Sequence, residues 1–324
     1  MTDGLALARK LYSGLTQLRI RSERALGIYA GHAVRSDAGG NQLIADALRS
    51  GRSFMAGRLG FHELDAISGA AGVRAEQAGG LTRWRSRVRA EPARFDAELL
   101  RCLQHIAGFF PAEPAAVQRL ADTLVDAIEA ADILAIWYRR YEDELMRRHA
   151  PAAIPILPRG LEPYYHAEPW SQQLASRRVL VVHPYEDSIR RQYAKRHLLF
   201  ADRAVWPDCE LLTLKAVQTL AGEPSAFPDW FAALEHMKRG IDALDFDVAI
   251  IGAGAYGFPL AAHVKRSGRS AIHIGGATQL LFGIAGKRWE DRPEVMALVN
   301  EHWVRPAPQE TPRAHQSVEG GAYW

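Results

Sequence analysis

The residues best suited to chemistry surround a glycine-rich turn in the last third of the chain. Residues 248–251 form a short apolar run, and Gly252, Gly254 and Gly257 follow it. An apolar run, glycines at this spacing and then a helical pattern are typical of a strand–turn–helix unit. The backbone N–H groups of such a turn, which here includes Tyr256, can bind a phosphate group at the N-terminus of the helix. We therefore expect an anion site at this turn.

A second short strand is expected at residues 270–274, and it ends in Gly275 and Gly276. With the turn it completes a βαβ unit, whose strands end at the same edge of a parallel sheet. In dinucleotide-binding proteins the second strand ends in an acidic residue that binds the ribose hydroxyls. Here His273 lies near that end, and the next acid is Glu290. The pattern favours a nucleotide sugar, bound through its diphosphate, and disfavours an NAD-dependent oxidoreductase.

A further candidate group follows a predicted strand at residues 54–57. Gly60 is expected to form the turn after the strand, with Arg58 before it and Glu63 in the first turn of the next helix. Ligands of open α/β sheets bind at the carboxyl ends of the strands. An arginine there can stabilise a leaving diphosphate, and a carboxylate can take a proton from an attacking hydroxyl. A structural salt bridge is the alternative for this pair.

A third group follows a predicted strand at residues 177–184, after which a helix is expected to begin at 185. The N-terminus of that helix is a second possible anion site, with an acid or a serine as its cap. The candidate residues are Asp187 for catalysis and His183, Ser188, Arg190 and Lys195 for substrate binding. A structural role is the alternative for His183 and for His273.

Composition limits the class of protein. The chain has 324 residues, of which 48% are hydrophobic and 24% charged, which is ordinary for a folded soluble protein. A net charge of +3 gives no global field that would favour nucleic acid as a partner. The two cysteines, Cys102 and Cys209, have no metal-binding or redox spacing. No apolar run approaches the roughly 20 residues that span a bilayer. We expect a cytoplasmic enzyme.

The chain divides into three parts by pattern. Residues 1–40 are expected to hold a basic amphipathic helix, whose leucine face could contact an anionic membrane surface or a partner chain. A helix that caps the domain or pairs in a dimer is the alternative. Residues 41–305 are expected to form one α/β domain, Rossmann-like, with a mostly parallel sheet, a helical insertion at about 90–150 and a proline-rich connection at 151–170. Residues 306–324 are expected to be a loose tail.

Three local expectations complete the sequence-based description. Asn41 is expected to cap a helix that begins at residue 42, and another helix is expected from Lys215 onward. Residues 79–89, rich in glycine and arginine, are expected to form a mobile loop.

Four stretches, taken in order, resemble the GT-D type of bacterial glycosyltransferase, a Rossmann-like family. The first, residues 54–63, contains Arg58-x-Gly60-x-x-Glu63, which is similar to the Arg-x-Gly-x-x-Glu signature of that family. The others are residues 108–111 with the helix after them, residues 169–170 followed by 179–193, and residues 250–257 through 271–276. Together they extend over roughly residues 40 to 290.

The resemblance implies transfer of a sugar from a nucleoside diphosphate donor to a glycan or glycolipid acceptor, in polysaccharide or glycoprotein assembly. It assigns Arg58 and Glu63 to the site directly. Phe61 occupies the position of an aspartate that many members carry, so binding of a divalent metal (Mn²⁺ or Mg²⁺) by Glu63 is left open. Transfer by single displacement would invert the anomeric centre. The alternative is a non-catalytic nucleotide- or glycan-binding protein on the same fold. The assigned glycines are Gly252, Gly254, Gly257, Gly275 and Gly276.

Overall fold

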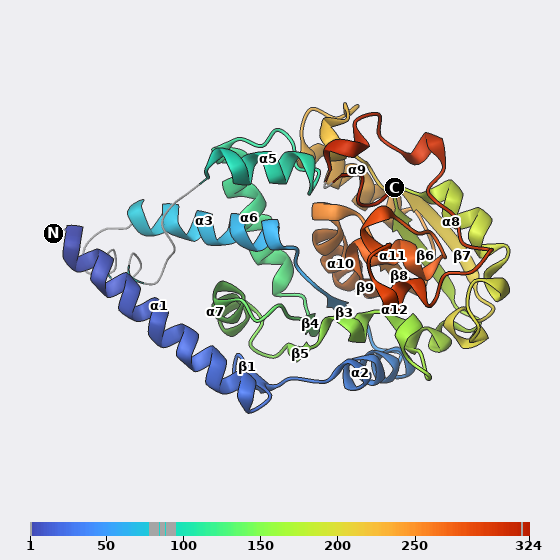
Figure 1. Ribbon diagram of the computed structural model, residues 1–324, viewed down its shortest axis with the longest axis horizontal. Coiled ribbons are helices and arrows are strands. Elements are labelled where there is room, and N and C mark those ends of the chain that lie inside the picture. The colour runs from blue at the N-terminus through green and yellow to red at the C-terminus, as the bar shows by residue number, and fades with distance from the viewer. Residues whose placement is uncertain (1, 78–83, 85–87, 89–94, 319) are drawn as a thin grey trace.

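The computed structural model, which describes residues 2–77, 84, 88, 95–318 and 320–324, is built around a seven-stranded parallel sheet (Figure 1). The strand order is β5-β4-β3-β9-β8-β6-β7, and every neighbouring pair is parallel. The expected α/β, Rossmann-like fold is confirmed. The strands are β3 (Met55–Gly57), β4 (Ile133–Ala135), β5 (Ile154–Ile156), β6 (Arg178–His183), β7 (Glu210–Lys215), β8 (Val248–Ile251) and β9 (Ser270–His273). A separate antiparallel pair is formed by β1 (Ile28–Tyr29) and β2 (His32–Ala33).

The central strands are apolar along their length because the sheet is covered on both faces. In β6, Leu180 and Val182 point into one apolar cluster, and Val179 and Val181 point into the other. This is the two-residue alternation of a strand. On the first face lie α3 (Phe61–Gln77), α5 (Ala97–His105), α6 (Pro114–Ile128), α7 (Arg140–His149), α9 (Trp230–Asp242) and α10 (Gly257–Arg266). On the second lie α2 (Asp37–Arg49), α8 (Glu186–Tyr193) and α11 (Thr278–Leu281).

This distribution of helices opens a crevice in the middle of the sheet. Strands β3 and β9 are neighbours, yet β3 continues into α3 on the first face and β9 continues toward α11 on the second. In open α/β sheets, such a point, at the carboxyl ends of the strands, is where ligands bind. The fold thus places the ends of two predicted motifs side by side.

The local prediction for Asn41 is wrong. Helix α2 begins at Asp37, and the Ser36 side chain caps it by accepting a hydrogen bond from the Gly39 N–H at 3.1 Å. Asn41 lies inside the helix, where its buried amide donates to the Glu168 carbonyl and accepts from the Trp170 N–H. Its bonds therefore tie the helix to the proline-rich segment.

The helix expected from Lys215 is also absent from this part of the structure. Lys215 ends β7, and the short turn Leu220–Gly222 follows it. Ala221 and Gly222 have φ of +60° and +74°, values that a right-handed helix does not accept. The segment 79–89, expected to be a mobile loop, lies outside the described residues apart from Trp84 and Val88.

The proline-rich segment supplies part of the sheet. It contains β5, which occupies an edge, the position in a sheet that tolerates Pro155. Tyr164 and Trp170 are buried in the second-face cluster. The segment therefore builds the domain core as well as connecting its halves.

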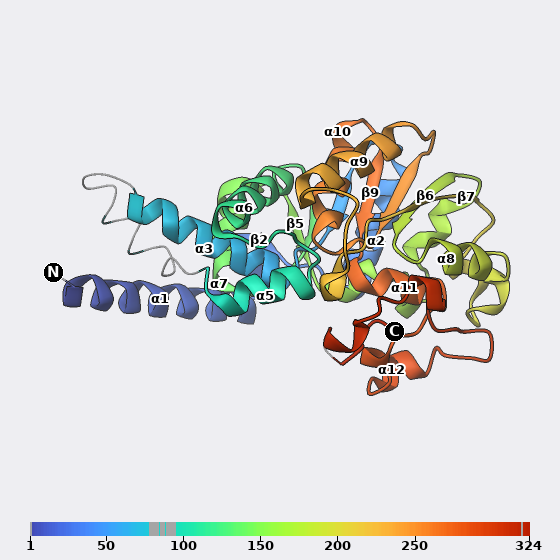
Figure 2. The ribbon, with the colours of Figure 1, turned by 90° about the horizontal axis from the view of Figure 1, so that it is seen from above.

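The C-terminal segment packs against the domain, unlike the loose tail that we expected. Glu310 and Val318 are almost fully buried. The Trp324 carbonyl accepts hydrogen bonds from the Lys287 N–H and from the Arg305 side chain. Figure 2 shows this segment beside α11 and α12 (Pro293–Met296), away from the N-terminus.

The N-terminal residues form α1 (Thr2–Ala25), as expected, at one end of the molecule (Figures 1 and 2). Thr16 and Ile20 are buried, whereas four leucines on another face are between 59% and 67% exposed. These are Leu7, Leu11, Leu15 and Leu18. Contact of this face with a membrane or a second copy remains a prediction. Among the described residues, no helix has the length and apolar character needed to cross a bilayer.

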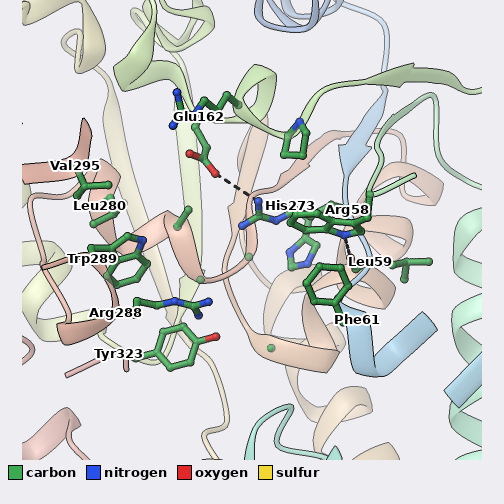
Figure 3. Close-up of a pocket in the computed structure, with 18 of the residues that line it drawn as sticks. Arg58, Leu59, Phe61, Glu162, His273, Leu280, Arg288, Trp289, Val295 and Tyr323 are labelled. Carbon is green, nitrogen blue, oxygen red and sulfur yellow. Dashed lines mark hydrogen bonds and ion pairs between the residues drawn. The ribbon is translucent and has the colours of Figure 1, made fainter. Parts of the chain in front are cut away.

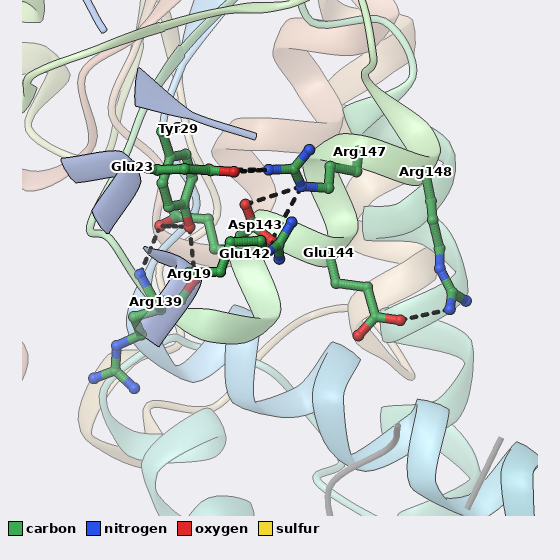
Figure 4. A network of polar contacts seen from close by, with 9 residues as sticks. All are labelled: Arg19, Glu23, Tyr29, Arg139, Glu142, Asp143, Glu144, Arg147 and Arg148. Atoms are coloured by element: carbon green, nitrogen blue, oxygen red, sulfur yellow. Dashed lines mark hydrogen bonds and ion pairs between the residues drawn. The ribbon is translucent and has the colours of Figure 1, made fainter. Parts of the chain in front are cut away.

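Charged side chains attach α1 to α7 (Figure 4). Asp143, whose side chain is fully buried, pairs with Arg19 of α1 and with Arg147 of its own helix. Arg147 also pairs with Glu23 of α1, at 2.7 Å. One buried carboxylate therefore neutralises two arginines that join the helices.

We expect Asp143→Asn to lower the free energy of unfolding by about 1–3 kcal/mol, because it leaves two partly buried arginines without their shared charge. Urea unfolding followed by circular dichroism measures the change. The matched control is Glu144→Gln on the same helix, whose pair with Arg148 is at the surface and contributes about 0–1 kcal/mol. Equal effects of the two substitutions would contradict the role given to Asp143.

Candidate functional site

A cavity of about 590 Å³ opens at the carboxyl ends of β3 and β9, in the crevice between the two layers of helices (Figure 3). Residues 58–63 after β3 and 273 and 275–277 at the end of β9 line it, and Gly254 joins them from the turn after β8. The volume is in the range of small-molecule sites. Figure 3 shows Arg288, Trp289 and Tyr323 on one side of the cavity and Phe61 and Leu59 on the other.

The structure brings together about half of the site residues predicted from the sequence. Those that line the cavity are Arg58, Gly60, Glu63, Gly254, His273, Gly275 and Gly276. Those outside its lining are His183, Asp187, Ser188, Arg190, Lys195, Gly252, Tyr256 and Gly257. The motif after β3 and the end of β9 therefore share one site, and the motif after β6 lies elsewhere.

Arg58 is held in the cavity wall by a carboxylate from the proline-rich segment. Its Nη1 lies 3.4 Å from Oε1 of Glu162, and both side chains are largely buried. Burial raises the pKa of Glu162, and the nearby Arg58 charge opposes that rise. Gly275 lies beside the guanidinium, and its φ of +72° is a left-handed backbone conformation that favours glycine. Arg58 is thus a cation already balanced by one acid.

Glu63 sits in the first turn of α3, with its carboxylate folded back against the Gly60 Cα, where any Cβ would overlap it. Burial raises its pKa, its own backbone N–H opposes the rise, and the charge of Asp65 adds to it. A carboxylate at this position is favourable because the helix N-terminus is partly positive. A raised pKa also brings a carboxylate closer to the range in which general bases work best.

His273 is a neutral group in this site. Its Nδ1 lies 3.1 Å from the Ile251 carbonyl, so Nδ1 carries the proton and Nε2 is left as an acceptor. Burial lowers its pKa to about 4, and the Arg58 charge adds to the lowering. Such a weak base is less suited than Glu63 to take a proton near neutral pH.

The glycine-rich turn is bonded largely to the protein itself. The Gly252, Ala255 and Tyr256 N–H groups donate to the carbonyls of Val182, Ala107 and Ala253. These three donors are therefore not free to bind a phosphate. Tyr256 is buried, with its ring stacked on that of Trp230 at 4.9 Å.

The glycines of this turn allow close packing. A Cβ on Gly252 would lie 2.6 Å from Thr278 Oγ1 and 2.8 Å from the His183 ring, and one on Gly257 would overlap the His273 ring. His183 is buried, its Nδ1 accepts from the Tyr185 N–H at 3.0 Å, and burial lowers its pKa to about 3.

The helix N-terminus after β6 is already bound to an acid of the chain. The Glu310 carboxylate accepts hydrogen bonds from the N–H groups of Asp187 and Ser188, at 2.8 and 3.1 Å, and from the Ser188 hydroxyl. The side chain of Asp187 is exposed and Arg190 pairs with Glu186. Since Glu310 lies 122 residues away from Ser188, no local pattern could have revealed it.

Sequence reasoning missed the residues that irregular segments bring to the cavity. Glu162 comes from the proline-rich segment, and Tyr323 comes from the tail. Arg288 and Trp289 follow α11, and their adjacency was the one available signal. Hydrophobic periodicity identifies helices and strands. It carries no information on the position of irregular segments in the folded protein.

The described residues hold no cluster of three or more His, Cys, Asp or Glu side chains that could bind a metal ion. Glu63 is a single carboxylate that packs against Gly60, so the donor set does not fit a metal centre made by the protein alone. Mg²⁺-type ions are often held by one or two carboxylates together with substrate phosphates, and metal binding through Glu63 remains a prediction.

Comparison of the chain with protein-family models, with curated proteins and with solved structures finds no match.

We expect Gly257→Ala to lower the free energy of unfolding by about 1–3 kcal/mol, because the added methyl group must displace the buried His273 ring. Gly14→Ala is the control: it lies inside α1 with nothing described within 4 Å of its Cβ position. That change should add about 0.5–1 kcal/mol through helix propensity. Urea unfolding measures both, and a Gly257→Ala protein as stable as the wild type would refute this packing.

Proposed function

We propose that the protein is a glycosyltransferase that moves a sugar from a nucleoside diphosphate sugar to a glycan or glycolipid acceptor. The observation that carries the proposal is the convergence of Arg58 and Glu63, a cation and a base of one motif, on a cavity that the end of β9 also lines. The location at the crevice of a parallel sheet is the usual one for nucleotides in such folds.

In the proposed reaction the acceptor hydroxyl oxygen attacks the anomeric carbon of the donor. Its proton passes to the Glu63 carboxylate, and the bond from the anomeric carbon to the phosphate oxygen breaks with its electron pair going to the diphosphate. Arginine side chains stabilise the charge that develops on the leaving group. A single displacement of this kind inverts the anomeric centre.

Aromatic side chains beside Glu63 support a sugar as the substrate. Phe61 is 42% exposed at the cavity, and its ring lies 4.7 Å from that of Trp137. The Arg139 guanidinium lies 4.4 Å from the centre of the Phe61 ring, so the part of Phe61 that stays exposed, and not a whole ring face, is what could contact the apolar side of a sugar.

We propose a cytoplasmic location because both cysteines are free thiols. Free thiols are typical of proteins in reducing compartments. The proposed steps do not require a divalent metal ion. The activity assay should therefore be run with Mn²⁺, with Mg²⁺ and with a chelator.

The alternative is a nucleotide- or glycan-binding protein without catalysis. The observation that favours it is the contact of Glu63 with Gly60, because a carboxylate that only stabilises the start of α3 would adopt this position. The two functions differ in whether wild-type protein releases nucleoside diphosphate from nucleotide sugars.

We expect Glu63→Gln to reduce sugar transfer by roughly 10²- to 10⁴-fold, because the amide cannot accept the proton. Asp187→Asn should retain wild-type activity, since Asp187 is exposed and outside the cavity lining. Release of nucleoside diphosphate from UDP-, GDP- and dTDP-sugars is the measurement, with melting temperature as the folding control. Equal losses in both variants, or no release by wild type, would reject the proposed base.

The pH profile gives an independent test of Glu63. A base acts only when deprotonated, so activity should fall as the pH decreases through its pKa. Because burial raises that pKa, the acid limb should lie above the ordinary carboxyl range near 4.5. An acid limb at or below this range would contradict a buried carboxylate as the base.

A further inference from the structure

Four arginines line the cavity, and they differ in their partners. Arg58 pairs with Glu162, and Arg159 pairs with Glu294 at 2.8 Å. Arg288, which is half-buried, has no ion pair with any carboxylate in the part of the chain that the structure describes. No carboxylate among the described residues of the cavity wall therefore neutralises the charge of Arg288. The fourth, Arg292, is exposed.

Aromatic rings hold the Arg288 guanidinium. Its Cζ lies 4.8 Å from the centre of the Tyr323 ring and 5.6 Å from that of Trp289 (Figure 3). Stacked on ring faces, a guanidinium keeps its N–H edge available, and that edge matches two oxygens of a phosphate. The two aromatic rings therefore restrict the position of the Arg288 guanidinium, while its N–H groups are not bound to a carboxylate of the described residues.

The last residues of the chain fix this arrangement. The Tyr323 carbonyl accepts from the Gln279 side chain at 3.2 Å, and the Arg288 N–H donates to the Ala322 carbonyl at 3.0 Å. The Tyr323 ring also lies against Gly276, where a Cβ would be 2.6 Å from Cε1. One of the glycines at the end of β9 therefore makes room for a side chain of the C-terminus.

We propose that Arg288 binds the diphosphate of the donor and that Tyr323 is its positioning residue. The inference rests on the proposed function and assigns the leaving group to one wall of the cavity. Figure 3 places Arg288 and Tyr323 opposite Phe61, which shares the first turn of α3 with Glu63. A base and a leaving group lie on opposite sides of the carbon in a single displacement, so the proposal requires Glu63 and Arg288 to face the donor from different walls of the cavity.

The test is calorimetric titration of the full-length protein with inorganic pyrophosphate at low salt. Arg288→Gln should weaken binding by about 10- to 100-fold, through loss of charge-assisted hydrogen bonds. Arg288→Lys should give a smaller loss, because it keeps the charge and loses the planar fork. The matched control is Arg266→Gln, an exposed arginine paired with Asp126 at the C-terminal end of α10, which should bind like the wild type.

Tyr323→Leu keeps the backbone bonds of the tail and removes the ring. It should weaken pyrophosphate binding by about 2- to 5-fold, the size of one exposed cation–π contact. Reduced binding with an unchanged melting temperature is the readout that a purely structural Tyr323 would not give.

Three outcomes would overturn the inference: no pyrophosphate binding by the wild type, wild-type affinity in Arg288→Gln, or equal losses in Arg288→Gln and Arg266→Gln. The result is separable from the proposed function. Binding lost in Arg288→Gln, with no sugar transfer by the wild type, would support the anion site and reject glycosyltransfer. Sugar transfer that is unaffected by Arg288→Gln would support glycosyltransfer and reject Arg288 as the anion site.

Discussion

The candidate site depends on two neighbouring strands whose following helices lie on opposite faces of the sheet. Strand β3 continues into α3 on one face of the sheet, and β9 continues toward α11 on the other. The backbone cannot close the space between these two connections, so a crevice forms at the carboxyl ends of the strands. Arg58, Glu63 and Arg288, on which the proposed chemistry depends, all line this crevice.

Close packing then decides which groups stay available for chemistry. The rings of His183 and His273 pack against Gly252 and Gly257, where burial lowers the pKa of both imidazoles. The resulting neutral histidines support the strand ends and are poor bases at neutral pH. The same burial acts in the opposite direction on Glu63, because it disfavours the charged form of an acid and so raises its pKa.

The C-terminal segment contributes side chains to two sites in the rest of the domain. Glu310 supplies a carboxylate to the N-terminus of α8, and Tyr323 supplies a ring to the cavity. The first contact satisfies backbone donors inside the protein, whereas the second holds Arg288 without neutralising it. A segment that is polar and rich in proline therefore takes part in the organisation of the proposed site.

Local signals in the sequence, namely apolar runs, helical periodicity and glycine turns, were enough to predict the α/β class, most of the strands and the motif with Arg58 and Glu63. They also indicated the strand end at Gly275. Tertiary structure decided the rest: that Glu310 binds the helix predicted as an anion site, and that Glu162, Arg288 and Tyr323 line the cavity. Those contacts join residues far apart in the chain through irregular segments, and their geometry exists only once the sheet has assembled.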